Sequence, residues 1–205
     1  MSQLVEERQS IARRSDLKGS ERRALLSDAT DSWLRGLLTD AIAQHGADPA
    51  QFALLAVGGY GRREMSLGSD IDVVLVHEPS ALRVEDVASS LWYPIWDSKI
   101  ALDHSVRTIA QARTLARDDF KVVLGLIDAR VVAGSTELGE SLRTGILGDW
   151  RASAGDRLVE LHATAMARRS RVGDLAQLLE PDVKEAYGGL RDAVLLRALA
   201  ASWTV

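Results

Sequence analysis

Hydrophobic residues near the N-terminus recur at helical spacing. Leu38 and Ile42 follow earlier leucines at intervals of three or four residues, and Gly46 closes the series. This pattern predicts that residues 1–46 are helical and end at the glycine, because glycine readily adopts the left-handed conformation found after helices. Arg8 and the other charged residues of this segment are expected to form a solvated face, and they indicate no chemistry.

The spacing changes to that of strands after residue 50. Two short runs, 52–57 and 71–76, are apolar and almost free of charge, as in strands buried on both faces. Two further strands are predicted at 100–106 and 130–133, and helices at 84–92, 119–129, 138–150, 157–171, 175–179 and 190–199. Pro94 is expected to end the helix before it, because proline lacks the N–H that a helix interior needs. The alternation predicts an α/β protein whose C-terminal part is mostly helical.

Composition restricts the class of protein but not the reaction. The 205 residues include 46% hydrophobic and 26% charged side chains, which is ordinary for one globular domain with a small helical addition. The net charge of −4 predicts no nucleic-acid-coating surface. Cysteine is absent, which excludes disulfides and thiolate chemistry. No apolar run reaches membrane-spanning length and the N-terminus lacks signal-peptide character, so we expect a cytoplasmic protein without a membrane partner.

Two carboxylates and a glycine pair carry the candidate chemistry. Asp70 and Asp72 lie two residues apart at the start of the second strand, so their side chains point to the same face. Like charges at this range repel and lose hydration beside an apolar strand, and a divalent cation offsets both penalties. Mg²⁺ fits, because it takes oxygen ligands from one or two carboxylates and from substrate phosphates. The backbone N–H groups of Gly58 and Gly59 could hold those phosphates, and Ser69 could add a hydroxyl.

The glycines and aspartates belong to a longer pattern. Residues 57–73 read Val-Gly-Gly-Tyr-Gly-Arg-Arg-Glu-Met-Ser-Leu-Gly-Ser-Asp-Ile-Asp-Val. This string resembles the signature of the polymerase-β-like nucleotidyltransferase superfamily, and within it that of the bacterial PII-protein uridylyltransferase/uridylyl-removing enzymes, whose actinobacterial members are described as adenylyltransferases. Three later segments are similar to motifs of the same family, namely Tyr-Pro-Ile-Trp-Asp at 93–97, His-Ser-Val-Arg-Thr at 104–108, and Pro-Asp-Val-Lys-Glu at 181–185 with Gly-Gly-Leu-Arg-Asp at 188–192. The resemblance covers residues 54–200.

The resemblance implies a fold and a set of site residues. The fold is a small mixed sheet flanked by helices, and the reaction is Mg²⁺-dependent nucleotidyl transfer in which Asp70 and Asp72 are catalytic and hold the metal. The superfamily usually has a third carboxylate on a neighbouring strand, as metal ligand or general base. Asp103 is the candidate and Asp97 its competitor, although the family often has glycine at the position of Asp103. The nucleotide-binding candidates are Gly58, Gly59, Ser69 and Arg62, with Arg63, Lys99 and Arg107 as further cations for the phosphates.

The resemblance also implies domains and partners. A helical segment is expected at 1–50, the nucleotidyltransferase core at 51–150, and the start of a helical domain at 151–205. Complete family members continue into an HD-type hydrolase domain and two ACT domains, so we expect the chain to be truncated. The family's acceptor is a tyrosine of the PII signal protein and its donor is UTP, or ATP in actinobacterial members.

Two other functions stay open on the residues alone. One is a stand-alone nucleotidyltransferase with another acceptor, such as an antibiotic or another protein, because the glycine and aspartate motif by itself would permit it. The other is a non-catalytic module that binds a nucleotide or a partner. Intact Asp70 and Asp72 argue against the second, since a degenerate site would be free to lose such a costly pair.

Overall fold

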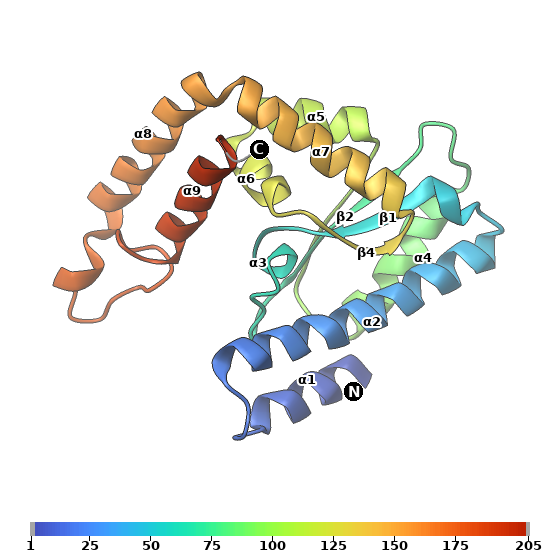
Figure 1. The fold of residues 1–205 in the computed structure, drawn as a ribbon. Coiled ribbons are helices and arrows are strands. Elements are labelled where there is room, and N and C mark those ends of the chain that lie inside the picture. Colours follow the sequence, from blue (N-terminus) through green and yellow to red (C-terminus); the bar gives the residue numbers. More distant parts are fainter. Residues whose placement is uncertain (1–2, 204–205) are drawn as a thin grey trace.

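The computed structural model describes residues 3–203, in which a central sheet has helices on both faces (Figure 1). Residues 1–2 of the predicted helical segment and 204–205 of the predicted C-terminal domain lie outside this range. The N-terminal segment forms two helices, α1 (Gln3–Arg13) and α2 (Gly19–His45). α2 begins where the Lys18 N–H donates to the Glu21 carboxylate at 2.8 Å. It ends at the predicted stop, Gly46, whose φ of 62° is left-handed.

Within the described residues the sheet has four strands, β1 (Phe52–Ala56), β2 (Ile71–His77), β3 (Leu102–Arg107) and β4 (Arg130–Gly134). Their order is β3-β2-β1-β4. β1 is antiparallel to both β2 and β4, whereas β2 and β3 are parallel. Parallel neighbours need a crossover connection, and α4 (Val84–Asp97) supplies it. This arrangement confirms the predicted α/β class with a small mixed sheet.

The turns on either side of β1 and the end of α4 add detail to the sequence prediction or differ from it. The glycine turn after β1 takes the form of a single helical turn, α3 (Gly58–Gly61), and a short 3₁₀ turn, Pro49–Gln51, precedes β1. The predicted end at Pro94 is wrong, because α4 continues to Asp97. Proline lacks only its own N–H donor, so the helix can continue beyond it. The Pro94 carbonyl still accepts from the Ser98 N–H at 3.2 Å, and Ile95, the next residue, is fully buried.

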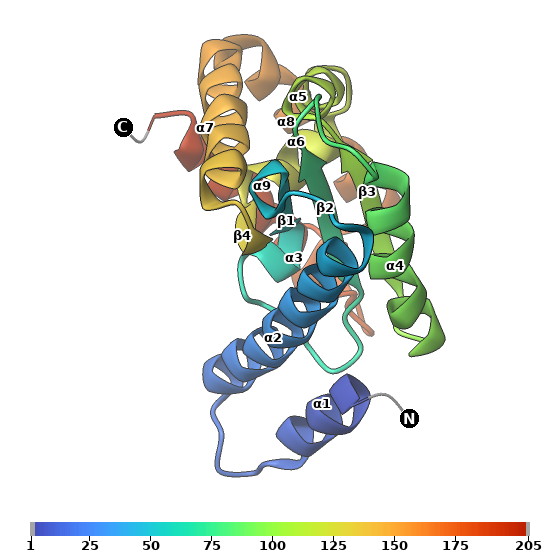
Figure 2. The same cartoon turned by 90° about the vertical axis from the view of Figure 1, so that its right-hand side faces the viewer.

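The two faces of the sheet contact different helices. Phe52 and Leu54 belong to a core shared with α1, α2 and α4, whereas Ala53 and Leu55 belong to a core shared with the helices on the opposite face. Those helices are α5 (Ile109–Asp118), α6 (Phe120–Ile127) and α7 (Thr136–Ala152). Figures 1 and 2 show the two layers on either side of the sheet. Side chains alternate between the two faces of a strand, and Asp72 lies on the same face of β2 as the residues that contact α5–α7. Its side chain therefore points toward the layer of helices that continues into the C-terminal part.

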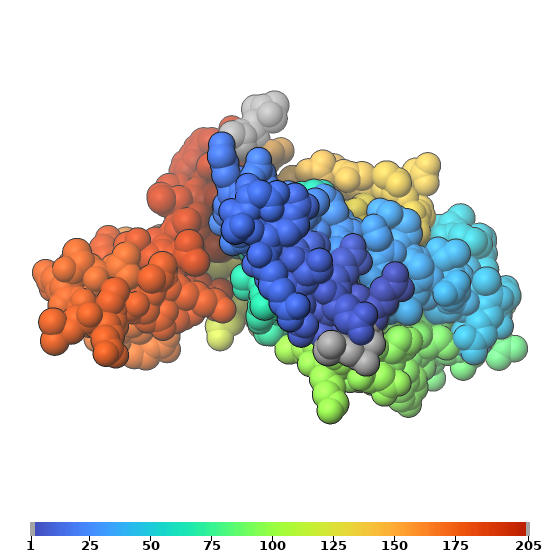
Figure 3. All heavy atoms as spheres, turned by 90° about the horizontal axis from the view of Figure 1, so that it is seen from below, coloured from blue at the N-terminus to red at the C-terminus, as the bar shows by residue number. Residues whose placement is uncertain are grey.

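The C-terminal part is mostly helical, as predicted, and forms a lobe beside the body of the molecule, coloured orange and red in Figure 3. It consists of α8 (Ala154–Val172), an irregular segment at 173–189 and α9 (Leu190–Ala201). The helix predicted at 175–179 is only a 3₁₀ turn, Leu175–Gln177. Trp150 at the end of α7 donates from Nε1 to the Ala198 carbonyl at 2.9 Å, which holds α9 in place. None of the helices in residues 3–203 has the length and apolar character needed to cross a membrane.

Candidate functional site

A cleft of about 1230 Å³ separates the sheet edge at α3, β2 and β3 from the C-terminal lobe. Residues of α6, α8 and α9 complete its wall. Five lining residues are acidic and seven are lysine or arginine, although the chain as a whole has a net charge of −4. This local excess of positive charge favours an anionic ligand, because a cleft concentrates the field of the charges that line it.

Asp70, Asp72 and Asp103 come together in this cleft. Asp72 lies in β2, directly opposite Asp103 in the parallel register of β2 and β3, and Asp70 immediately precedes β2. Burial, and after it the charges of Asp103 and Asp70, raise the pKa of Asp72 to about 6. The cluster therefore contains repulsion that a cation would relieve. Asp97, the competitor for the third carboxylate, ends α4 and does not line the cleft.

The donor atoms fit magnesium only in part. Within residues 3–203, no group of three or more histidine, aspartate or glutamate side chains could hold a metal ion by itself. Protein sites for Mg²⁺ commonly use one or two carboxylates and are completed by water and substrate phosphates. Asp70 and Asp72 meet this requirement, and the raised pKa of Asp72 shows that its negative charge is under-compensated. These two carboxylates could contribute ligands to a metal ion whose other ligands are water or a bound phosphate.

The turn α3 places bare backbone beside Asp72. Gly58 has a φ of 56°, and a Cβ atom on it would lie 3.7 Å from Asp72 Oδ2. The Val57 N–H donates to the Asp72 carbonyl at 3.0 Å, which fixes the start of α3 against β2. The first N–H groups of a helix have no partner inside the helix. Gly58 and Gly59 thus line the cleft next to the carboxylates, and no side chain caps the start of α3 with a hydrogen bond.

A buried hydrogen-bond network holds α3 in position. The Tyr60 hydroxyl donates to Asp31 of α2 at 2.6 Å, and Arg130 of β4 donates to both oxygens of that carboxylate at 2.6 and 3.1 Å. Burial, and after it the Asp31 charge, raises the pKa of Tyr60, so the hydroxyl stays protonated and keeps donating. These three partners were not predicted, because they are distant in sequence and no local spacing relates them.

Arg62 follows α3 and lines the cleft, but two carboxylates already engage its guanidinium. Its Nη1 donates to Asp128 at 2.8 Å and its Nε to Glu64 at 2.7 Å. The Asp128 side chain, only 6% exposed, also accepts from Arg197 of α9 at 2.9 Å. Gly61 touches the same loop, since a Cβ atom on it would lie 2.2 Å from the Asp128 carbonyl oxygen. Arg62 therefore fixes α3 to the loop between α6 and β4, whatever its contact with a nucleotide.

The loop before Asp70 is anchored by the N-terminal helix. Arg8 was expected to be solvated, and that expectation is wrong: it is 3% exposed and donates from Nη2 to the carbonyls of Ser66 and Ser69 at 3.0 and 2.9 Å. These carbonyls give the buried guanidinium two acceptors at Nη2, whereas its Nε has no hydrogen-bond partner among residues 3–203. The Ser69 hydroxyl accepts from the Ser66 N–H at 2.9 Å, so Ser69 closes this loop as well as lining the cleft.

The opposite wall of the cleft was not predicted. Lys184 and Glu185 line it from the segment that joins α8 to α9, and Arg191 lines it from the first turn of α9. The positive charges of Lys184 and Arg191 reach Asp72 and lower its pKa, against the larger effects of burial and of the neighbouring carboxylates. Both cations occur in segments that carry the family resemblance, and that position is the signal that could have identified them. Of the other expected cations, Arg107 lines the cleft, whereas Arg63 and Lys99 do not.

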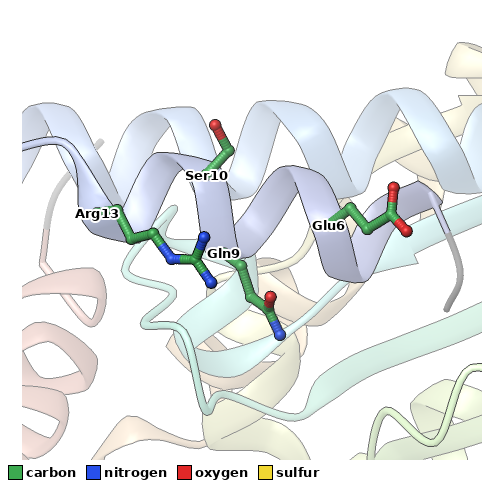
Figure 4. A pocket seen from close by; sticks show the side chains of 4 residues that line it. All are labelled: Glu6, Gln9, Ser10 and Arg13. Atoms are coloured by element: carbon green, nitrogen blue, oxygen red, sulfur yellow. The ribbon is translucent and has the colours of Figure 1, made fainter.

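A second hollow, of about 340 Å³, runs along α1 and is lined by Glu6, Gln9, Ser10 and Arg13 (Figure 4). All four residues lie on one helix at the spacing of a single face. Their side chains therefore have no opposing group from a second element in the wall of the hollow. We assign this hollow no role in chemistry.

Comparisons with known proteins find sequences similar to this chain over most of its length. Residues 5–93 match the family model "Putative nucleotidyltransferase DUF294". Enzymes named "Bifunctional uridylyltransferase/uridylyl-removing enzyme" match most of the chain. The relative from Streptomyces coelicolor is 52% identical over 90% of this chain and 22% of its own length. That from Mycobacterium tuberculosis is 42% identical over 93% of this chain and 24% of its own length.

The chain is a relative of these uridylyltransferases. A less similar relative, from Caulobacter vibrioides, is 30% identical over 89% of this chain and 20% of its own length. The chain thus spans about a fifth to a quarter of the length of the curated relatives it matches. A solved structure described as a toxin-antitoxin with AMP-PNP aligns with 65% of the chain at 14% identity and a TM-score of 0.39, which is too low to support an inference.

Proposed function

We propose that this chain transfers UMP or AMP from a nucleoside triphosphate to a tyrosine of the PII nitrogen-signalling protein, with Mg²⁺ as cofactor. The observation that carries the proposal is the group formed by Asp70, Asp72 and Asp103 next to the bare amides of Gly58 and Gly59, in a cleft with an excess of cations. Similarity to enzymes named uridylyltransferase supports the same class of reaction.

Each residue has a defined task in this proposal. The tyrosine oxygen forms a bond to the α-phosphorus, the bond from that phosphorus to the bridging oxygen breaks, and pyrophosphate leaves with the electron pair. Mg²⁺ held by Asp70 and Asp72 would neutralise charge on the phosphates as pyrophosphate leaves. Asp103, across the register from Asp72, takes the tyrosine proton or adds a metal ligand. The nucleotide is bound by Gly58, Gly59, Ser69 and Arg62.

The partners and the location in the cell belong to the same proposal. PII is the proposed acceptor, and UTP or ATP the proposed donor, in the cytoplasm and without nucleic acid or membrane. Residues 51–150 form the proposed catalytic core, 1–50 support it, and 151–205 begin a helical domain. The support from 1–50 is physical, because Arg8 fixes the loop before Asp70 and Asp31 fixes Tyr60.

Transfer of label from α-³²P-UTP and α-³²P-ATP, in separate tubes, to purified PII with Mg²⁺ tests this function. The wild-type chain should label PII with one of the two donors, and the Asp70→Asn/Asp72→Asn double variant should not. Asp103→Asn should reduce the rate by about 100-fold or more if this carboxylate is the general base. Asp97→Asn is the matched control: it removes one carboxylate outside the cleft and should leave the rate unchanged.

The same assay separates the competing functions. If a full-length relative labels the same PII while this chain binds nucleotide but transfers nothing, the chain is a binding module. If PII stays unlabelled while another protein or an antibiotic is labelled, the chain is a nucleotidyltransferase with a different acceptor. Equal labelling by wild type and the double variant would refute the assigned carboxylates.

A further inference from the structure

The segment between α8 and α9 forms the wall of the cleft opposite the carboxylates, and its own hydrogen bonds fix its conformation. The Asp182 carboxylate accepts from the N–H groups of Lys184 and Glu185, both at 2.9 Å. The Arg191 N–H donates to the Lys184 carbonyl at 3.1 Å, which ties the start of α9 to the same turn. Gly189 fits because a Cβ atom there would lie 2.4 Å from the Val183 carbonyl oxygen. The backbone of Lys184 is thus fixed on both sides before any ligand binds.

Most of the cations in this wall are already paired. Arg191 donates to Glu185 at 2.9 Å, and Arg168 forms an ion pair with Asp192. Lys184 differs: among residues 3–203 its ammonium group has neither an ion pair nor a side-chain hydrogen bond. It is an exposed cation that lines the cleft and whose field reaches Asp72.

Lys184 lies across an open cleft from three carboxylates. This arrangement suits a ligand whose negatively charged groups face the cation and whose bound metal ion faces the carboxylates. A nucleoside triphosphate with its metal has this distribution of charge. Lysine binds phosphate as a flexible point charge, which suits an oxygen group whose charge grows as it leaves.

We propose that Lys184 binds the β- and γ-phosphates of the donor nucleotide, and that the segment around it is part of the donor site although it lies far in sequence from the glycine and aspartate motif. This inference rests on the proposed function. It assigns the C-terminal lobe a direct contact with the substrate.

Lys184→Ala is compared with Lys184→Arg and with Lys121→Ala, which removes the same charge from α6 in the same cleft. Two quantities are measured with Mg²⁺: equilibrium binding of the triphosphate and of the corresponding monophosphate, and KM and kcat for the donor. Lys184→Ala should weaken triphosphate binding about 10-fold or more and monophosphate binding less than about twofold, because only the triphosphate has the contacted groups. Lys184→Arg should retain most of the affinity, and Lys121→Ala should weaken triphosphate binding clearly less than Lys184→Ala does, because it changes only the general field of the cleft.

Three results would overturn the role of Lys184: wild-type affinity for the triphosphate in Lys184→Ala, equal losses for triphosphate and monophosphate, or equal losses in Lys184→Ala and Lys121→Ala. In each of these cases the wild-type chain would still bind and transfer nucleotide, so the proposed function would stand. Absence of Mg²⁺-dependent nucleotide binding in the wild type would overturn both. Unchanged thermal unfolding of Lys184→Ala is expected, since the replaced ammonium holds no other element.

Discussion

Replacing Asp72 by asparagine should stabilise the metal-free protein while abolishing nucleotidyl transfer. Folding raises the pKa of this carboxyl from 3.8 to about 6, first through burial and then through Asp103 and Asp70. Each pKa unit corresponds to about 1.4 kcal/mol, so the upper limit of the penalty at neutral pH is about 3 kcal/mol. Asp72 is partly exposed to the cleft and solvent screens its charge, so we expect about 1–2 kcal/mol.

The pH dependence has a definite sign. An acid with a raised pKa in the folded state binds protons more tightly there, so the penalty is present above about pH 6. It disappears as the pH falls toward the unfolded value of 3.8, because Asp72 is then protonated in both states. The stability advantage of Asp72→Asn should therefore be largest near pH 7.5 and should vanish near pH 4.

Urea unfolding followed by circular dichroism, in EDTA and at several pH values, measures this difference. The midpoint of thermal unfolding should rise by about 3–6 °C at pH 7.5, the shift expected for this free energy in a chain of this length. Addition of Mg²⁺ should reduce the difference, since only the wild type gains the cation. A variant that is less stable than wild type, or whose advantage does not change with pH, would refute the account of Asp72 as an under-compensated charge.

Two other substitutions test the support of the site and of the helical layer. Gly61→Ala should cost about 2–3 kcal/mol in urea unfolding, because its Cβ atom would lie 2.2 Å from the Asp128 carbonyl oxygen, whereas Gly68→Ala, with no atom within 4 Å of the added Cβ, should stay within about 0.5 kcal/mol; equal effects would contradict the close contact. Asp149→Asn should cost about 1–2 kcal/mol at pH 7, because hydrogen bonds from Arg113 hold the pKa of Asp149 down at about 2. That stability is present above pH 3.8 and is lost as the pH falls to about 2, so a variant equal to wild type at pH 7 would refute the pairing.

The strands and the carboxylate pair could be predicted because their signals are local. The runs at 52–57 and 71–76 are buried on both faces of the sheet and so contain almost nothing but apolar residues. Asp72 stands out against such a run, and the period of two places Asp70 beside it. Asp103 needed one more fact, the parallel register of β2 and β3, which the sequence does not contain.

The support of the site could not be predicted in the same way. Arg8 looks like any charged residue of an amphipathic helix, and only the fold brings the carbonyls of Ser66 and Ser69 to its guanidinium. Asp31 looks like a polar residue of α2, yet it is buried and accepts from residues of α3 and β4. Long-range partners of this kind produce no repeating pattern in the sequence, because each helix or strand supplies a single residue to the network.

The C-terminal lobe is coupled to the glycine turn through one buried carboxylate. Asp128 accepts from Arg62, which follows α3, and from Arg197 of α9. A carboxylate that is almost fully buried needs such partners, because an unpaired charge in the interior is strongly destabilising. A shift of α9 would remove Arg197 from Asp128 and leave Arg62 as its remaining arginine partner. It would therefore alter the contact between Asp128 and Arg62 that positions α3. The lobe is therefore connected to the site in two places, through the Arg197–Asp128–Arg62 contacts and through the wall of the cleft that faces Asp72.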